Sequence, residues 1–282
     1  MPLPHPDQPI LIIPDVHQNH RFITELLSVA EAFGPLSEII FLGDFLDAKE
    51  PRYQNKGSVL ETLTLLCDLL SSSSIPVSIL WGNHDWQYWI CRSLIFSRQP
   101  ILSRAKVQEI GLQYDTLEAL RSRINLPSGE QGSPLNLLLN HAKLTLFRHG
   151  YVLSHAGFAP EFWISPSDPV PLSQTNPALS VDLINQRFEA EVPVCSPKDQ
   201  GFFSAAGFVR GGDRPCGGPL WLDWNHEFDP EGLPYPQIVG HTRGPNVRQK
   251  GGSYCLDAGQ SAGALLYPDQ KIAILPVSSK SP

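Results

Sequence analysis

Short polar motifs that contain metal-binding side chains recur along the sequence, each directly after an apolar run. There are five of them: DVH at 15–17, GDFLD at 43–47, GNHD at 82–85, SHAG at 154–157 and GHT at 240–242. The metal-binding side chains of these motifs offer nitrogen and oxygen atoms and no sulfur, which suits manganese, iron or zinc better than copper(I) or an iron–sulfur cluster. The carboxyl ends of strands in an open α/β sheet line the ligand crevice, so we expect the motifs to converge there.

The types and spacing of these groups favour a pair of metal ions. Two cations about 3.5–4 Å apart need a shared ligand, and a carboxylate has two oxygens for this. Asp44 follows a glycine at the end of the central predicted strand and is the natural bridge. Asp15 and His17 are two residues apart, so on an extended strand end both would face the same way. We expect glycines before the ligands to allow sharp backbone turns, namely Gly43, Gly82 and Gly240.

The elements that would position these motifs follow from the hydrophobic periodicity. Short apolar runs at residues 10–13, 38–42 and 77–81 predict buried parallel strands. Helical spacing of apolar residues between them, at 23–30 and 59–70, completes a β-α-β-α-β start with right-handed crossovers. Further patterns predict a helix at 179–188 and strands at 143–147, 151–154, 237–240, 253–257, 264–267 and 271–275.

Length and composition favour one large globular domain. The chain has 282 residues, near the upper size of a single domain, and its 41% hydrophobic content excludes a disordered chain. Its 27 prolines are about twice the average usage and predict a loop-rich protein. We predict a single domain over residues 1–282, with a helical cap insertion around 86–142 and a proline-rich loop region around 156–236.

Charge and targeting signals restrict the partners and the location. The net charge of −7 argues against nucleic acid or an anionic membrane as a partner. No stretch approaches 18 continuous apolar residues, and the N-terminus lacks the basic region of a signal peptide. The five cysteines are scattered without a CxxC pair, which indicates reduced thiols and a cytoplasmic location rather than disulfides or a thiolate zinc site.

In their order, the five motifs resemble the signature of the calcineurin-like metallophosphoesterase superfamily. That signature is DxH, GDxxD, GNH followed by Asp or Glu, a later His before a small residue, and GH near the C-terminus. The resemblance implies an α/β fold in which two mixed sheets pack as a sandwich with helices outside. It also implies two divalent metal ions, one held by Asp15, His17 and Asp44, and the other by Asp44, Asn83, His155 and His241.

The resemblance further implies that His84 is the unliganded histidine near the leaving group and that Asp47 orients it. The GHT motif and residues 218–221 resemble the branch that contains serine/threonine phosphatases, Shewanella-like phosphatases and diadenosine tetraphosphatases. That branch usually has an arginine directly after GDxxD to grip a phosphate, whereas this chain has Ala48 and Lys49. We expect another cation to do this, with Arg210 or Arg214 ahead of Arg243 and Arg52. The alternative for residues 209–218 is a flexible loop.

The expected reaction is the hydrolysis of a phosphate monoester, in a phosphoprotein or a small molecule. A two-metal-activated water would attack the phosphorus, and His84 would act as general acid. Two alternatives stay open: a dinucleotide polyphosphate hydrolase, and a non-catalytic scaffold with the same fold. The presence of His84 and of every expected ligand argues against the scaffold, although Asp15 or Asp44 taken alone would be interpreted as a helix cap. The acidic charge balance disfavours a nuclease.

Overall fold

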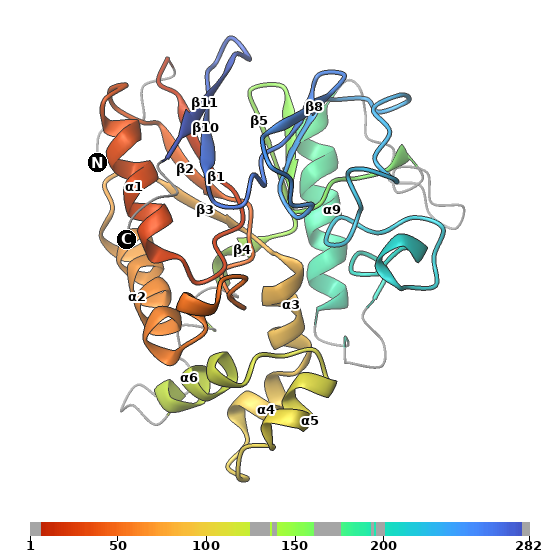
Figure 1. Cartoon of the computed structure of the whole chain (residues 1–282). Helices are drawn as coiled ribbons and strands as arrows, with labels where there is room; N and C mark the ends of the chain where they lie inside the picture. The colour runs from red at the N-terminus through yellow and green to blue at the C-terminus, as the bar shows by residue number, and fades with distance from the viewer. Residues whose placement is uncertain are drawn as a thin grey trace.

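Two mixed β-sheets pack face to face and helices cover their outer faces (Figure 1). The computed structural model describes residues 7–124, 136, 140–160, 176–192, 195 and 201–277. This is the α/β arrangement of two packed mixed sheets that the motifs imply. Parts of the predicted cap (125–135 and 137–139) and of the predicted proline-rich region (161–175, 193–194 and 196–200) lie outside the described residues.

The first sheet contains the predicted β-α-β-α-β start of the chain. Its strand order is β11-β10-β1-β2-β3-β4, and β1 to β4 run parallel whereas β10 and β11 are antiparallel additions at one edge. Helices α1 (His20–Glu31) and α2 (Lys56–Ser72) make the two crossovers. The strands are β1 (Ile10–Ile13), β2 (Glu38–Phe41), β3 (Val77–Leu80), β4 (Ala142–Lys143), β10 (Ala262–Leu266) and β11 (Ile272–Pro276).

The second sheet has the strand order β5-β6-β7-β9-β8. A hairpin forms the pair β5 and β6, and β6, β7 and β9 run parallel to one another. The strand predicted at 143–147 is divided between the two-residue β4 and β5. Strand β8 was not predicted, because it reads Arg-Gln-Lys and so has no apolar pattern. The strands are β5 (Thr145–Arg148), β6 (Tyr151–Ser154), β7 (Gln237–Val239), β8 (Arg248–Lys250) and β9 (Ser253–Cys255).

The first sheet is buried on both faces, with a hydrophobic cluster on each side of it. Ile12 and Ile40 point between the sheets and pack with Leu153 of the second sheet. The alternate residues Leu11 and Ile39 point the other way, into the core that α1 and α2 cover. A strand that is buried on both faces has no polar side, which explains the continuous apolar runs in the sequence.

The remaining helices lie outside the sheets. Helix α3 (Asn83–Ile90) begins in the GNHD motif, before the predicted cap region, and lies near the middle of Figure 1. Three short helices fall within the predicted cap region and lie at the bottom of the figure: α4 (Arg92–Phe96), α5 (Arg104–Glu109) and α6 (Tyr114–Ile124). Lys56 of α2 and Glu118 of α6 form an ion pair at 2.6 Å that joins this group to the body of the protein. Helix α9 (Pro177–Glu191) covers the second sheet, where the Asn185 amide oxygen accepts from the backbone N–H of Thr145 at 3.1 Å.

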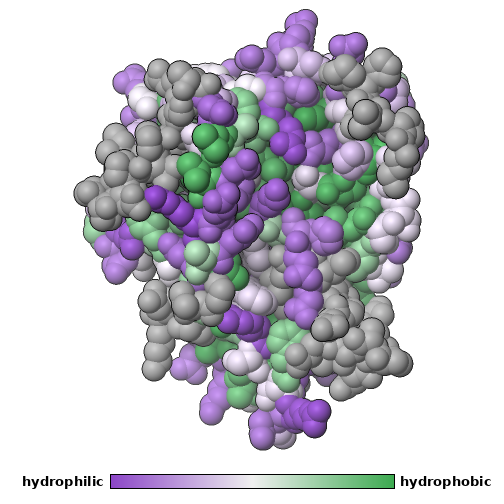
Figure 2. Space-filling view, turned by 180° about the vertical axis from the view of Figure 1, so that it is seen from behind, coloured by the Kyte–Doolittle hydropathy of each residue, from purple (hydrophilic) through white to green (hydrophobic). Residues whose placement is uncertain are grey.

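Figure 2 shows the side opposite to that of Figure 1, where hydrophilic side chains are spread over the face and hydrophobic ones form separate patches. Within the described ranges, no helix has both the length and the apolar character needed to cross a membrane.

Candidate active site

All five motifs lie where the sequence places them, at the carboxyl ends of β1, β2, β3, β6 and β7. Hydrogen bonds between their loops hold the two sheets together at this end. The backbone N–H of His17 donates to the Asp44 carbonyl at 2.6 Å, and His155 Nδ1 lies 2.8 Å from the Leu42 carbonyl. The Asp15 carboxylate accepts from the backbone N–H of His241 at 3.0 Å. The site is therefore one structure built from distant parts of the chain.

Two glycines allow the motif loops after β2 and β3 to pack backbone against backbone. A Cβ atom on Gly43 would lie 2.5 Å from the Gly82 nitrogen, and one on Gly82 would lie 2.1 Å from the Asp44 nitrogen. Among the three glycines that precede ligands, only Gly43 has a left-handed backbone, with φ at 102°. Gly82 is extended, and a Cβ on Gly240 would meet Asp15 at 2.1 Å. The expected sharp turn thus applies to Gly43, whereas Gly82 and Gly240 are needed for close approach.

Four predicted site residues have a backbone conformation that non-glycine residues rarely adopt. The φ angles are 48° at His17, 54° at Asp44, 61° at Asp47 and 65° at His241. Such a conformation costs roughly 1–3 kcal/mol per residue and is concentrated at functional sites. The surrounding hydrogen bonds between loops fix these backbones, so the fold stabilises strained turns at the positions where donor atoms converge.

Asp15 and His17 are not on an extended strand end, so the predicted reason for their orientation is wrong. β1 ends at Ile13, and the left-handed turn at His17 separates the two side chains. His17 Nε2 faces Asp44 Oδ2 at 3.5 Å, because its Nδ1 is held by the Asp47 carbonyl at 2.8 Å. Asp15 instead faces the loop after β7. Both side chains reach the site, but from different directions.

Four predicted ligands aim their donor atoms at one point. The Asn83 side-chain oxygen lies 2.9 Å from His155 Nε2 and 2.9 Å from His241 Nδ1, and these two nitrogens are 3.2 Å apart. Asp44 Oδ1 lies 3.5 Å from His155 Nε2. His155 Nδ1 donates to the Leu42 carbonyl, which leaves the lone pair of Nε2 directed at this point.

A second group of donor atoms shares Asp44 with the first. Ligand atoms of His17, Asp44 and His84 lie within 4.8 Å of one another, as do those of Asp44, His155 and His241. His84 thus stands in this group where Asp15 was expected. Asp15 is close enough to Asp44 for the charge of Asp44 to raise the pKa of Asp15.

The electrostatics of both groups suit divalent cations. Burial raises the pKa of Asp15 well above its usual range, and the charges of Asp257 and Asp44 add to the rise. Burial lowers the pKa of His17 to about 3 and that of His241 well below its usual value, so both rings are neutral and able to bind metal. Buried carboxylates that repel one another need a cation between them, and the donor set therefore fits the metals that the motifs imply.

His84 and Asp47 form a hydrogen-bonded pair at the edge of these groups. His84 Nδ1 lies 3.1 Å from Asp47 Oδ2, and the hydroxyl of Tyr88 donates to Asp47 Oδ1 at 2.5 Å. The Tyr88 hydroxyl itself accepts from the backbone N–H of Gln113 at 2.9 Å. Burial acts to lower the pKa of His84, but the Asp44 charge and the Asp47 hydrogen bond outweigh burial and raise it.

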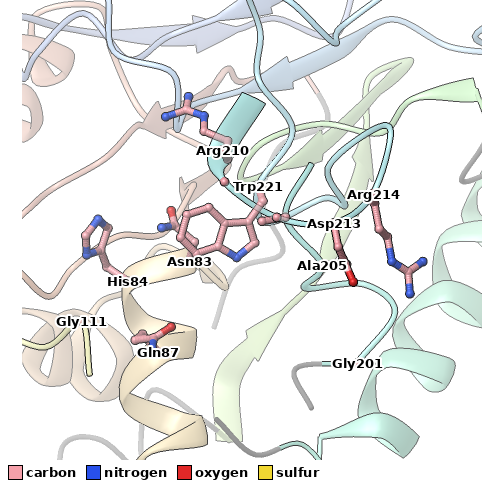
Figure 3. Close-up of a pocket in the computed structure, with 13 residues that line it drawn as sticks. Asn83, His84, Gln87, Gly111, Gly201, Ala205, Arg210, Asp213, Arg214 and Trp221 are labelled. Atoms are coloured by element: carbon pink, nitrogen blue, oxygen red, sulfur yellow. The ribbon is translucent and has the colours of Figure 1, made fainter. Parts of the chain in front are cut away.

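Two cavities meet at His84. One, of about 600 Å³, is lined by members of both donor groups and by three cations, Lys49, Arg210 and Arg243. The other, of about 740 Å³, extends toward Arg214 (Figure 3). The two cavities have four lining residues in common: Asn83, His84, Arg210 and Trp221.

Comparisons with known proteins agree with this geometry. The sequence matches the family model of the calcineurin-like phosphoesterases over residues 8–242, a span that contains all five motifs. The chain belongs to this family. This phosphoesterase is therefore a hydrolase of phosphate esters, and the implied family and fold are confirmed.

Solved structures of similar fold include two phosphatases. A cold-active protein-tyrosine phosphatase of a psychrophilic Shewanella species has 18% sequence identity and a TM-score of 0.58, covering 95% of this chain and 80% of that one. A protein serine/threonine phosphatase from Saccharomyces cerevisiae has 15% identity and a TM-score of 0.51, covering 98% and 82%. Curated protein sequences give no match to this phosphoesterase.

The four arginines of this phosphoesterase that were predicted to grip the phosphate lie in different places. Arg210 and Arg243 line the cavity beside the donor groups, and Arg210 Nη2 is 2.8 Å from Asp223 Oδ2. Arg214 lies at the end of the other cavity away from His84 (Figure 3), with its guanidinium 5.2 Å from the centre of the Phe202 ring. Arg52 pairs with Glu50 at 2.8 Å and lines neither cavity.

Sequence reasoning missed three residues of the site. Tyr88 fixes Asp47, and its place one helical turn after His84 was the signal. The Asp85 carboxylate accepts from the backbone N–H groups of Phe45, at 2.9 Å, and Leu46, at 3.0 Å, so it holds the GDFLD loop. Asp257 lines the cavity and acts electrostatically on Asp15, but no motif singled it out.

Proposed function

We propose that the protein hydrolyses phosphate monoesters with two divalent metal ions of manganese, iron or zinc. Asp15, His17 and Asp44 would hold one ion, and Asp44, Asn83, His155 and His241 the other. Two observations support this proposal: donor atoms of Asp44 lie within 4.8 Å of those of His17 on one side and of those of His155 and His241 on the other, and the Asp44 charge acts on the buried Asp15. When bound, the metals would supply an activated water and positive charge for the phosphate oxygens.

His84 is proposed to protonate the leaving oxygen. Asp47 accepts from Nδ1 and so leaves Nε2 as the atom that can hand over a proton. The second oxygen of Asp47 is held by Tyr88, so the carboxylate cannot turn away from the ring. An acid that is fixed in this way suits leaving groups that are strongly basic as anions.

The shape of the site supports an organic leaving group larger than the phosphate itself. The cavity of about 740 Å³ begins at His84 and extends away from the donor groups. This is within the usual size range of small-molecule sites, roughly 300–1,000 Å³. A phosphorylated small molecule and a phosphorylated segment of a protein both meet this requirement. In this proposal Arg210 and Arg243, which line the cavity beside the donor groups, would contact the phosphate, and Arg214 would contact the leaving group.

A substrate screen with added Mn²⁺ tests the function. It compares phosphate monoesters, phosphodiesters and diadenosine tetraphosphate on wild type and on Asp44→Asn, which keeps the shape of the bridging side chain but not its charge. We expect monoesters to be the best substrates and Asp44→Asn to lose activity. A preference for diadenosine tetraphosphate would support the dinucleotide alternative. A folded, metal-loaded protein without any activity would overturn the proposal.

The proposed location is the cytoplasm.

A further inference from the structure

A lysine that the motifs did not assign lies against the proposed acid. Lys49 follows the GDFLD motif, and its Nζ lies 2.8 Å from His84 Nε2. An ammonium group can only donate hydrogen bonds, so His84 Nε2 accepts from Lys49. The Nδ1–H group of His84 donates to Asp47. Both nitrogens of His84 are therefore engaged, one by a carboxylate and one by a cation.

Within the described part of the chain, the charge of Lys49 is not paired with an acidic group. No carboxylate of the described residues lies within 4.0 Å of its Nζ, although the same loop carries Glu50, which pairs with Arg52 instead. Lys49 is exposed and lines the cavity that contains the donor groups. An exposed cation that lines a cavity is available to an anion that enters it.

Arg210, one of the two other cations of this cavity, is already engaged. Arg210 Nη2 contacts Asp223 at 2.8 Å and donates to Thr242 Oγ1 at 3.0 Å. Asp223 is fixed in turn by the backbone N–H of Asn225 at 2.9 Å. Arg210 therefore enters any anion complex with part of its charge already compensated. The Lys49 ammonium does not, and it is within hydrogen-bond distance of His84.

We propose that Lys49 binds the phosphate group of the substrate next to His84. This inference rests on the proposed phosphomonoesterase function and names a further residue for it. Lys49 Nζ lies at hydrogen-bond distance from Nε2, which is where the leaving oxygen must lie to receive a proton. When substrate enters, the ammonium turns on its flexible four-carbon stem and donates to an oxygen of the phosphate. Its contact with His84 in the free protein thus marks the position of the ester oxygen.

The test uses inorganic phosphate as the probe and the full-length protein loaded with Mn²⁺. Lys49→Met removes the charge at nearly constant length, Lys49→Arg keeps the charge, and Arg52→Met removes a nearby cation that lines neither cavity. Phosphate affinity is measured by calorimetry and by competitive inhibition, together with kcat, KM and metal content. We expect Lys49→Met to weaken phosphate binding by about 10- to 100-fold, the usual effect of losing a hydrogen bond to a charged group.

The other variants and measurements distinguish phosphate binding by Lys49 from a purely structural role. Lys49→Arg should recover most of the phosphate affinity, Arg52→Met should stay within about twofold of wild type, and all variants should keep their metal. Unchanged phosphate affinity in Lys49→Met, with a lower kcat, would overturn the proposal, because Lys49 would then act only through His84. Wild type that binds phosphate but hydrolyses no ester would refute the proposed function alone, since the calorimetry still decides the role of Lys49.

Discussion

Replacing Tyr88 by phenylalanine tests whether the His84–Asp47 pair works as an oriented acid. Tyr88 is fully buried, and its hydroxyl donates to Asp47 Oδ1 and accepts from the Gln113 N–H. The substitution Tyr88→Phe keeps the ring in the core but removes both contacts. Asp47 keeps its hydrogen bond to His84 Nδ1, but its carboxylate becomes free to rotate because this torsion has a broad energy minimum.

The size of the effect follows from these contacts. Two buried polar groups each lose a partner, which should cost about 1–3 kcal/mol of folding stability and roughly 2–8 °C in Tm. The rate falls only through the looser orientation of the acid. We expect kcat/KM for an alkyl phosphate to fall by roughly 3- to 10-fold, equal to about 1 kcal/mol in the transition state. For p-nitrophenyl phosphate, whose leaving group needs no proton, the fall should be below about twofold.

The assay combines steady-state kinetics on the two substrates with thermal unfolding for Tm and elemental analysis for metal content. Tyr151→Phe is the matched control, because Tyr151 is also a buried tyrosine but the hydrogen bond of its hydroxyl, to the Gln270 carbonyl at 3.4 Å, is long and lies outside the site. It should leave both rates unchanged. Equal losses on the two substrates for Tyr88→Phe, at normal metal content, would refute the orientation argument and assign Tyr88 to phosphate placement or general packing.

Three further outcomes check the metal site and the acid. Asp44→Ala should lose both metals and His17→Ala mainly one, as measured by elemental analysis; one metal per chain in wild type would contradict the bridged pair. His84→Asn should slow hydrolysis of an alkyl phosphate by roughly 10²- to 10⁴-fold, and that of p-nitrophenyl phosphate clearly less, at unchanged metal content. Gly82→Ala should lower both Tm and metal content, because its Cβ would lie 2.1 Å from the Asp44 nitrogen; a normal Tm would refute the packing argument.

The sequence was sufficient for the parts of the structure that depend on local patterns. Buried parallel strands such as residues 10–13 have a continuous apolar run, and the motif after each strand is placed by the strand itself. The convergence of the five motifs could be predicted because parallel strands end at the same edge of a sheet. Strand β8 could not, since Arg-Gln-Lys is held by pairing with β9 rather than by an apolar face.

Side-chain directions at the site were less predictable. Alternation along an extended strand gave the wrong reason for the orientation of His17, because the left-handed turn there depends on hydrogen bonds to the loop after β2. Tyr88 and Asp85 act on residues about 40 positions earlier, so the sequence does not reveal their partners, although the place of Tyr88 one helical turn after His84 pointed to the site. Which cation is available to bind the phosphate depends on acidic partners such as Asp223, which pairs with Arg210. Only tertiary packing reveals such partners.

The hydrogen bonds that join the motif loops have a consequence for the time at which metals are loaded. The bond from the His241 N–H to Asp15 spans 226 positions, and that from His155 to Leu42 spans 113. A growing chain on the ribosome has the first proposed ligands long before His241 emerges, and until then the proposed second ion lacks a ligand. Metal capture at both sites is thus expected only after His241 has left the ribosome. From then on, free metal at 100 times its Kd adds about 2.7 kcal/mol of stability per site by mass action.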